Sequence, residues 1–212
     1  MADGGLGPSL IKICGITRVV DVEMALGAGA TGIGMVLAPS ARRVTPELAA
    51  SLVAQVADRA LSVAVYRDVE PAQIAALTAQ VRPHAVQLHD PPPPGLLDEL
   101  RAAGCVIVRA VAASDAAIAD LDDEPFDAIL LDGTHPGSGQ AHGFDAATSR
   151  PWHRPLIAAG GLTSSSVREV AAQTWVWGVD VSSGVEASPG VKDAARIHAF
   201  VDAARAGLAD RS

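Results

Sequence analysis

The chain has 212 residues, of which 49% are hydrophobic and 19% are charged, and its formal net charge is −8 at pH 7. This composition is typical of a globular domain with a large apolar core. An acidic chain without a basic face argues against nucleic acid as a partner, and no apolar run approaches the ~20 residues of a membrane span. The two cysteines have no metal-ligand spacing and suggest no disulfide framework. We therefore expect a cytoplasmic protein that binds neither nucleic acid nor membrane.

Short apolar runs alternate with helical patterns along the chain. We expect residues 1–9 to form a flexible lead-in and residues 10–212 to form a single domain. The apolar runs predict strands at 10–14, 33–37, 61–66, 84–89, 106–111, 126–132, 156–159 and 175–180. The segments between them predict helices at 19–28, 45–57, 71–81, 95–103, 115–121, 163–172 and from 194 onward.

Local signals mark the start of several helices and one long loop. Thr45 is a candidate N-cap followed by a proline at the first helical position, and Thr163 and Asp193 are further candidate N-caps. Residues 133–151 contain four glycines and two prolines. We expect this segment to be the longest irregular one, with His142 as a solvated loop residue and a short helical turn after residue 145.

Strands that alternate with helices predict right-handed crossovers and parallel pairing. Eight such units in a chain of this length predict an α/β fold, a single (β/α)8 TIM barrel with eight parallel strands. The alternative is a doubly wound open sheet. That fold usually carries a glycine-rich loop after its first strand, and the segment 15–17 is too poor in glycine for one.

Strand alternation predicts which side chains point into the barrel mouth, where active sites of this fold lie. If Cys14, Asp132 and Asp180 point inward, then Lys12 does too, and the branched residues beside them face the helices. A buried lysine is costly unless a carboxylate pairs with it. We therefore predict an ion pair between Lys12 and Asp180, which lie on the first and last strands of the closed barrel.

Cys14 and Asp132 then face each other across the mouth. A thiol stabilised by a nearby cation is a usable base, and a buried carboxylic acid with a raised pKa is a usable acid. Such a pair suits an isomerisation that moves protons. The alternatives are a small buried hydrophobe at Cys14 and a carboxylate at Asp132 that caps a turn.

Two further groups of residues suit an anionic substrate. The strand ending at Asp180 continues into Ser182, Ser183 and Gly184, whose amides and hydroxyls suit a phosphate. Gly160 and Gly161 end the preceding strand. In the second loop, Arg42 is either a clamp for a carboxylate or a solvated arginine. Gln87 and His89 end the fourth strand, and His89 is either a ligand-side donor or only a polar strand end.

The chain resembles phosphoribosylanthranilate isomerases from residue 10 to residue 205. The resemblance rests on one short motif at each of several strand ends: Lys12-Ile13-Cys14-Gly15, Ser40-Ala41-Arg42, Val86-Gln87-Leu88-His89, Leu130-Leu131-Asp132, Ala159-Gly160-Gly161-Leu162, the segment 178–186 and the segment 188–193. Each motif alone is weak, but their order along the chain is specific.

The resemblance implies an Amadori rearrangement without metal or cofactor, acting on a small phosphorylated substrate. By the family pattern, Asp132 is the general acid and Cys14 is the general base. Arg42 binds the anthranilate carboxylate, and the phosphate is bound by Gly160, Gly161, Ser182, Ser183 and Gly184. Lys12, Gln87, His89 and Asp180 complete the substrate site. A bifunctional relative that also serves histidine synthesis is disfavoured, because such enzymes carry aspartate at the position of Cys14.

Three segments depart from the family pattern: Asp90 replaces a glycine, the loop at 133–151 is longer, and the third strand ends Val65-Tyr66-Arg67. These differences lie beside the expected anthranilate half of the site. They leave two alternatives open. One is a related phosphosugar isomerase with a different amine partner, and the other is a barrel that only binds a phosphorylated ligand. Both a monomer and a homodimer are compatible with the sequence.

Overall fold

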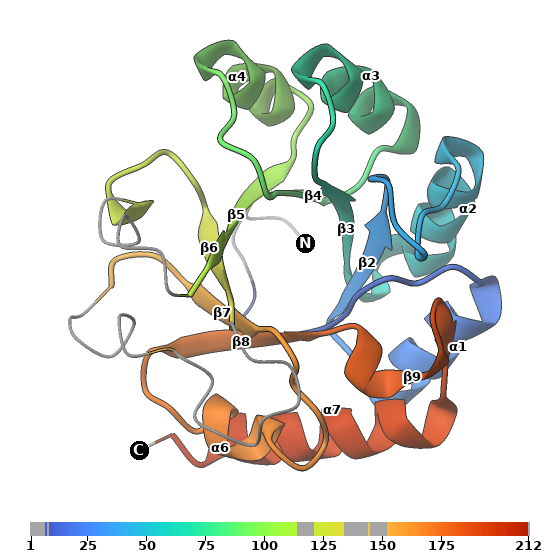
Figure 1. Ribbon diagram of the computed structural model, residues 1–212, viewed down its shortest axis with the longest axis vertical. Coiled ribbons are helices and arrows are strands. Elements are labelled where there is room, and N and C mark those ends of the chain that lie inside the picture. The colour runs from blue at the N-terminus through green and yellow to red at the C-terminus, as the bar shows by residue number, and fades with distance from the viewer. Residues whose placement is uncertain (1–6, 8, 114–120, 134–143, 145–151, 212) are drawn as a thin grey trace.

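The computed structural model describes residues 7, 9–113, 121–133, 144 and 152–211. Eight parallel strands form a closed barrel in which each strand pairs with the next, and β8 pairs with β1. Figure 1 shows the strands at the centre and the helices on the outside. The predicted (β/α)8 barrel is therefore confirmed, and the open sheet is excluded.

The strands agree with the predicted apolar runs to within two residues at each end. They are β1 Leu10–Ile13, β2 Gly32–Val36, β3 Leu61–Tyr66, β4 Ala85–Leu88, β5 Val106–Ala112, β6 Ala128–Asp132, β7 Leu156–Ala159 and β8 Val176–Val181. The helices are α1 Val19–Ala28, α2 Pro46–Val56, α3 Pro71–Val81, α4 Pro94–Ala102, α6 Val167–Ala171 and α7 Ala194–Ala209, with a short 3-10 helix η1 at Ala57–Arg59.

Two of the predicted N-caps are confirmed. The Thr45 hydroxyl accepts a hydrogen bond from the amide of Leu48 at 3.2 Å, and the Asp193 carboxylate accepts one from the amide of Arg196 at 2.9 Å. Both caps satisfy an amide that the first helical turn leaves unpaired. They fix where α2 and α7 begin, directly after the loops that approach the barrel mouth.

The helix predicted from Thr163 to residue 172 is shorter than expected. Thr163 does not cap it, and α6 begins only at Val167. Instead, the Thr163 amide donates to the Ser166 hydroxyl at 3.1 Å, and the Ser166 amide donates to the Thr163 carbonyl at 3.2 Å. Serine hydroxyls that bond to nearby backbone groups compete with helical hydrogen bonds, so residues 164–166 form turns and delay the helix.

The segment after β8 contains more structure than the predicted turn. A 3-10 helix, η3, spans Ser183–Val185, and two short antiparallel strands follow, β9 at Glu186–Ser188 and β10 at Val191–Lys192. Between the two strands, Gly190 adopts φ +80°, which favours glycine. This hairpin lies beside α1 in Figure 1 and carries two charged residues toward the mouth.

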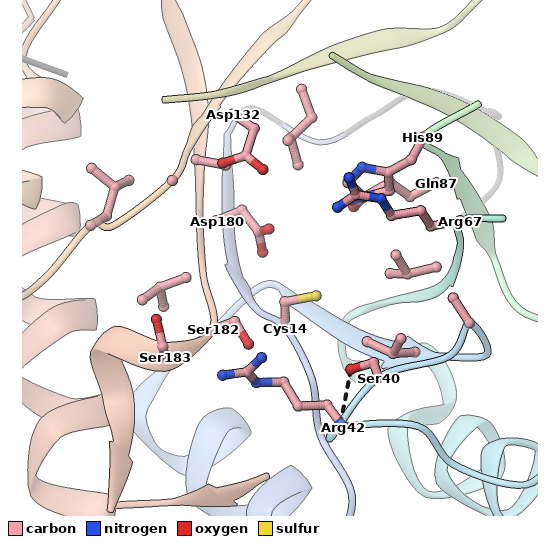
Figure 2. Close-up of a pocket in the computed structure, with 18 of the residues that line it drawn as sticks. Cys14, Ser40, Arg42, Arg67, Gln87, His89, Asp132, Asp180, Ser182 and Ser183 are labelled. Carbon is pink, nitrogen blue, oxygen red and sulfur yellow. Dashed lines mark hydrogen bonds between the residues drawn. The ribbon is translucent and has the colours of Figure 1, made fainter. Parts of the chain in front are cut away.

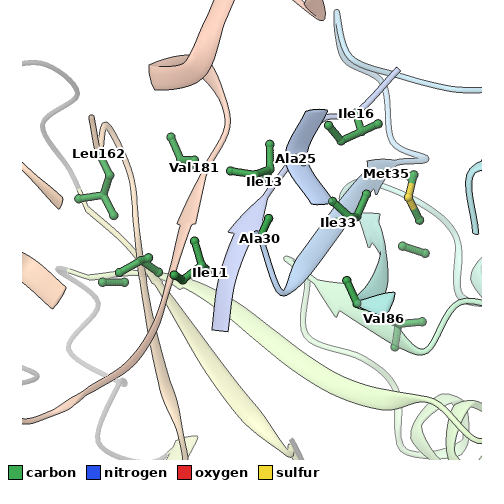
Figure 3. Close-up of a cluster of buried hydrophobic side chains, with 14 of the residues drawn as sticks. Ile11, Ile13, Ile16, Ala25, Ala30, Ile33, Met35, Val86, Leu162 and Val181 are labelled. Carbon is green, nitrogen blue, oxygen red and sulfur yellow. The ribbon is translucent and has the colours of Figure 1, made fainter. Parts of the chain in front are cut away.

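The predicted alternation of inward and outward side chains is confirmed. Ile11, Ile13, Ile129, Val179 and other branched residues belong to the cluster that packs between the barrel and the helices, part of which Figure 3 shows. Smaller clusters fill the barrel interior and include Ala128 and Leu130 of β6. Outward burial of branched residues leaves the inward positions of β1, β6 and β8 free for polar groups.

Several expectations fall on residues outside the described part of the chain. They are most of the lead-in, residues 115–120 of the fifth predicted helix, His142, and the helical turn after residue 145. Within the described residues, no helix combines the length and the apolar character that a bilayer crossing needs.

Candidate active site

Nearly all the predicted site residues line one cavity of about 330 Å³ at the carboxyl ends of the barrel strands (Figure 2). The predicted residues that line it are Cys14, Arg42, Gln87, His89, Asp132, Gly160, Gly161, Asp180, Ser182, Ser183 and Gly184. Lys12 lies one layer deeper inside the barrel, with 1% of its surface exposed. These predicted residues come from six strand ends or the loops after them, and they meet at one place because the barrel is closed.

The floor of the cavity is a buried polar network. The Lys12 ammonium lies 3.0 Å from a carboxylate oxygen of Asp180 and 2.9 Å from the side-chain oxygen of Gln87. The predicted ion pair is thus confirmed. Burial disfavours the ammonium, but Asp180 and Cys14 together raise the pKa of Lys12, so the group stays charged. Gly34 on β2 leaves room for it, since a Cβ there would lie 3.0 Å from the Lys12 side chain.

Cys14 lies directly after β1, and its amide continues the pairing with β8 by donating to the Val181 carbonyl at 2.8 Å. Burial raises the pKa of its thiol, and the opposing positive charges of Lys12 and Lys192 only reduce that rise. The thiol form therefore predominates at neutral pH, and the two ammonium groups stabilise the thiolate whenever it forms.

Asp132 ends β6 on another wall of the cavity, and in Figure 2 its carboxyl points toward the centre. Burial and then the negative charge of Asp180 raise the pKa of Asp132, while Arg67 acts in the opposite sense. A carboxyl with a raised pKa keeps its proton at a higher pH than an exposed aspartate does, which is what a proton donor requires.

His89 is linked to the buried network through Gln87. The Gln87 amide nitrogen and the His89 Nε2 lie 3.0 Å apart. Burial lowers the pKa of His89, and the positive charges of Arg67 and Lys12 lower it further. The imidazole is therefore neutral at pH 7 and offers a hydrogen bond to the cavity without adding a charge.

The wall formed by the loops after β7 and β8 consists mainly of glycines and serines. Gly160 and Gly161 adopt φ values of +87° and +64°, which favour glycine. Gly184 packs on the carbonyl of Leu162, where a Cβ would clash. The Ser182 hydroxyl is buried and makes no hydrogen bond to the described residues. This wall suits an anion such as phosphate, because its close-packed backbone presents amides and a hydroxyl.

The Arg42 side chain is partly buried, with 27% of its surface exposed, and it is paired with a carboxylate. Its Nε donates to one carboxylate oxygen of Glu186 at 2.7 Å, and its Nη2 donates to the other at 2.8 Å. The Arg42 amide also donates to the Ser40 hydroxyl at 2.9 Å (dashed line in Figure 2). The two-point pair with Glu186 fixes the plane of the guanidinium beside Ser182, at the edge of the cavity.

Three residues of the site received no predicted role from the sequence. Arg67 follows β3, lines the cavity, and in Figure 2 points its guanidinium toward the centre. Its position at a strand end was the available signal. Glu186 and Lys192 belong to the β9–β10 hairpin, and their side chains lie 2.9 Å apart. Both lie in motifs that carry the family resemblance, but their contact could not be predicted because it depends on how the hairpin folds back.

A closed barrel whose mouth holds a carboxyl, a thiol and a wall of glycines and serines defines a (β/α)8-barrel enzyme whose site suits acid–base chemistry. The model of the N-(5'-phosphoribosyl)anthranilate isomerase family matches residues 11–203. The chain belongs to this family, as the resemblance in its sequence predicted.

Individual relatives agree with the family match. An N-(5'-phosphoribosyl)anthranilate isomerase of Paramagnetospirillum magneticum is 37% identical over 214 residues, covering 94% of this chain and 99% of that protein. The crystal structure of phosphoribosyl anthranilate isomerase from Thermotoga maritima matches with a TM-score of 0.80 and 33% identity, over 93% of this chain and 98% of that one. A further isomerase structure, in complex with reduced 1-(o-carboxyphenylamino)-1-deoxyribulose 5-phosphate, matches with a TM-score of 0.78 and 32% identity, over the same shares of the two chains.

Proposed function

We propose that this protein converts N-(5'-phosphoribosyl)anthranilate into 1-(2-carboxyphenylamino)-1-deoxyribulose 5-phosphate, the Amadori rearrangement of tryptophan biosynthesis. The observation that carries the proposal is the convergence of the Cys14 thiol, the Asp132 carboxyl and a wall of glycines and serines on one cavity. Family membership supports the same reaction. Because the substrate has a phosphate at one end and a carboxylate at the other, holding both ends orients the sugar carbon that reacts.

In the proposed reaction, Asp132 donates its proton to the furanose ring oxygen as the bond from C1' to that oxygen breaks. The nitrogen lone pair forms an open-chain iminium, which is a Schiff base. The Cys14 thiolate then removes the proton from C2', and the electron pair of that bond forms an enolamine. Tautomerisation of the enolamine gives the ketone. Both proton transfers use side chains of this chain, so the proposal invokes no metal or cofactor.

The remaining roles follow from position. Gly160, Gly161 and residues 182–184 hold the phosphate. Arg42 holds the anthranilate carboxylate with the part of its guanidinium that Glu186 does not engage. Lys12 and Asp180 support the thiolate and the sugar from below, and the neutral His89, aligned by Gln87, donates or accepts a hydrogen bond to the substrate.

Turnover of freshly prepared N-(5'-phosphoribosyl)anthranilate by the purified protein tests the reaction. We expect a kcat within the usual enzymatic range of ~1–10³ s⁻¹ and growth of a tryptophan auxotroph that lacks this isomerase step. Turnover only with the phosphoribosyl adduct of another amine would instead favour the related isomerase. The observation that makes this isomerase a second candidate is the presence of Arg67 in the cavity. Ligand binding without any turnover would support a barrel that only binds.

For this role we propose a cytoplasmic location and a monomer or homodimer. A crystal structure of monomers of the dimeric isomerase from Thermotoga maritima also matches this chain, with a TM-score of 0.77 and 31% identity. Light scattering coupled to size-exclusion chromatography separates the two oligomeric states of this protein. Cell fractionation of the native source tests the location.

A further inference from the structure

A buried carboxylate beneath the cavity wall has no part in the proposed proton transfers. Glu186, at the start of β9, is 6% exposed. Its two oxygens accept hydrogen bonds from Arg42, one of them also from the Lys192 ammonium at 2.9 Å, and the Gly190 amide lies 3.3 Å from the same oxygen. Burying a carboxylate is costly unless partners of this kind surround it, so its position calls for an explanation.

We propose that Glu186 is a positioning residue that aligns Arg42 and the phosphate-binding loop with each other before substrate binds. The inference rests on the proposed function, because it assigns both ends of that substrate. It concerns a residue that touches neither reacting carbon. Its effect is transmitted by two cations: Arg42 at the edge of the cavity and Lys192 beneath Ser182.

The first connection leaves Arg42 able to bind a ligand. A guanidinium carries five N–H groups, and Glu186 takes one on Nε and one on Nη2. Two on Nη1 and one on Nη2 remain. The two-point pair fixes the flexible arginine side chain in advance, so less conformational freedom is lost when a substrate carboxylate binds.

The second connection reaches the phosphate-binding loop. The Lys192 side chain is fully buried, and its ammonium donates to the Ser182 carbonyl at 3.0 Å as well as to Glu186. Ser182 immediately precedes the turn at residues 183–185. Glu186 therefore fixes, through Lys192, the peptide that aims this turn at the cavity.

The charges of the three groups also favour an anion. Arg42 and Lys192 carry two positive charges and Glu186 one negative charge, so the group has a net positive charge at neutral pH. Hydrogen bonds from both cations hold the pKa of Glu186 at about 2, although burial opposes this. Without the carboxylate, burial would favour loss of the Lys192 proton, because burial is the main effect that lowers the pKa of Lys192.

The hairpin completes the alignment by reaching a third loop. The Thr17 hydroxyl, which lies between β1 and α1, donates to the Gly190 carbonyl at 2.5 Å. The loops that follow β1, β2 and β8 therefore meet around Glu186. A shift of this carboxylate is transmitted to the two substrate-binding loops together.

The test is the isosteric variant Glu186→Gln, which keeps the shape and removes the charge. We expect KM for N-(5'-phosphoribosyl)anthranilate to rise by roughly tenfold to a hundredfold, the size expected for lost hydrogen bonds to charged groups, and kcat to change less. The affinity for inorganic phosphate alone should fall too. The matched control is Glu99→Gln on the exposed face of α4, which removes the same charge and should change neither.

Double variants show whether the effect runs through the two cations. If Glu186 acts through Arg42, then adding Glu186→Gln to Arg42→Met should change the KM for substrate far less than it does in the wild type. Lys192→Met should weaken phosphate binding and leave the affinity for anthranilate unchanged. Full additivity of Glu186→Gln and Arg42→Met, or a KM within twofold of the wild type in Glu186→Gln, would overturn the proposal.

If the glutamine variant folds poorly, Glu186→Asp replaces it in the test. The shorter side chain keeps the charge, so its KM should lie between those expected for the wild type and for Glu186→Gln. A wild-type protein that binds phosphate but turns over no substrate would refute the proposed function. The phosphate measurements on the Glu186 and Lys192 variants would still decide whether the carboxylate positions the loop.

Discussion

The Lys12 ammonium and the Asp180 carboxylate lie 3.0 Å apart inside the barrel, on the first and last of its strands. Removing one partner leaves the other charge buried and unpaired. We expect Lys12→Met to lower the free energy of unfolding by about 3 kcal/mol, toward the lower end for such pairs because Asp180 borders the cavity. Urea denaturation measures this. The control is Arg168→Met, which breaks an exposed pair with Asp210 and should cost less than about 1 kcal/mol.

Cys14→Ser tests the proposed base. A serine hydroxyl has nearly the same size but is a far weaker acid than a thiol, so the proton at C2' would lose its acceptor. We expect kcat to fall by about 10²–10⁴-fold, with the affinity for inorganic phosphate unchanged. Steady-state kinetics measures kcat, and calorimetry measures the affinity for phosphate. Retention of most of the activity would remove Cys14 from the mechanism.

Asp132→Asn tests the proposed acid in the same way. The amide keeps the shape of the carboxyl and loses the acidic proton, so ring opening should become rate-limiting and kcat should fall by about 10²–10⁴-fold. An open-chain substrate analogue that needs no ring opening provides the control. The variant should process it nearly as well as the wild type does, and equal losses on both substrates would contradict the assigned role.

The pH profile depends on two groups that are both raised in pKa, Asp132 and Cys14, each mainly by burial. The productive form has a protonated carboxyl and a thiolate. Because the carboxyl loses its proton at a lower pH than the thiol does, this form is most populated between the two pKa values. We therefore expect a bell-shaped plot of kcat/KM against pH. Its acidic limb, set by Asp132, should lie above the ordinary aspartate pKa, and its alkaline limb, set by Cys14, above the ordinary thiol pKa. The Arg67 charge lowers the pKa of Asp132, so Arg67→Gln should move the acidic limb to higher pH. An unmoved or downward-shifted limb would contradict this electrostatic link.

Gly160 packs against the proposed acid. At its φ of +87°, an added Cβ would lie 2.6 Å from a carboxyl oxygen of Asp132 and 2.6 Å from the Gly133 carbonyl. We expect Gly160→Ala to lower both kcat and the affinity for phosphate, since the acid and the backbone wall must shift together. Gly27→Ala is the control: nothing lies near its Cβ position on α1, so this variant should gain stability by about 0.5–1 kcal/mol at unchanged activity.

The sequence was informative wherever periodicity alone determines the structure. Strand alternation correctly placed Lys12 and Asp180 inside the barrel, since only one of the two phases of a two-residue repeat turns the branched neighbours toward the helices. The partner of Arg42 was not predictable. Glu186 reaches it only because the β9–β10 hairpin folds back over the β2 loop, and no local spacing encodes that approach. Similarly, Thr163 has the composition of an N-cap, but the serines after it compete for the same backbone groups.

The closure of the barrel has a consequence for how the protein is synthesised. Lys12 leaves the ribosome 168 residues before the carboxylate that neutralises it. Until β8 has emerged, the nascent chain gains little by burying β1, because dehydrating an ammonium without a counterion costs several kcal/mol. We therefore expect the first strand to take its place in the barrel only after β8 has been synthesised. A fragment that stops short of that strand should show no trace of the catalytic cavity, however many of its other units have folded.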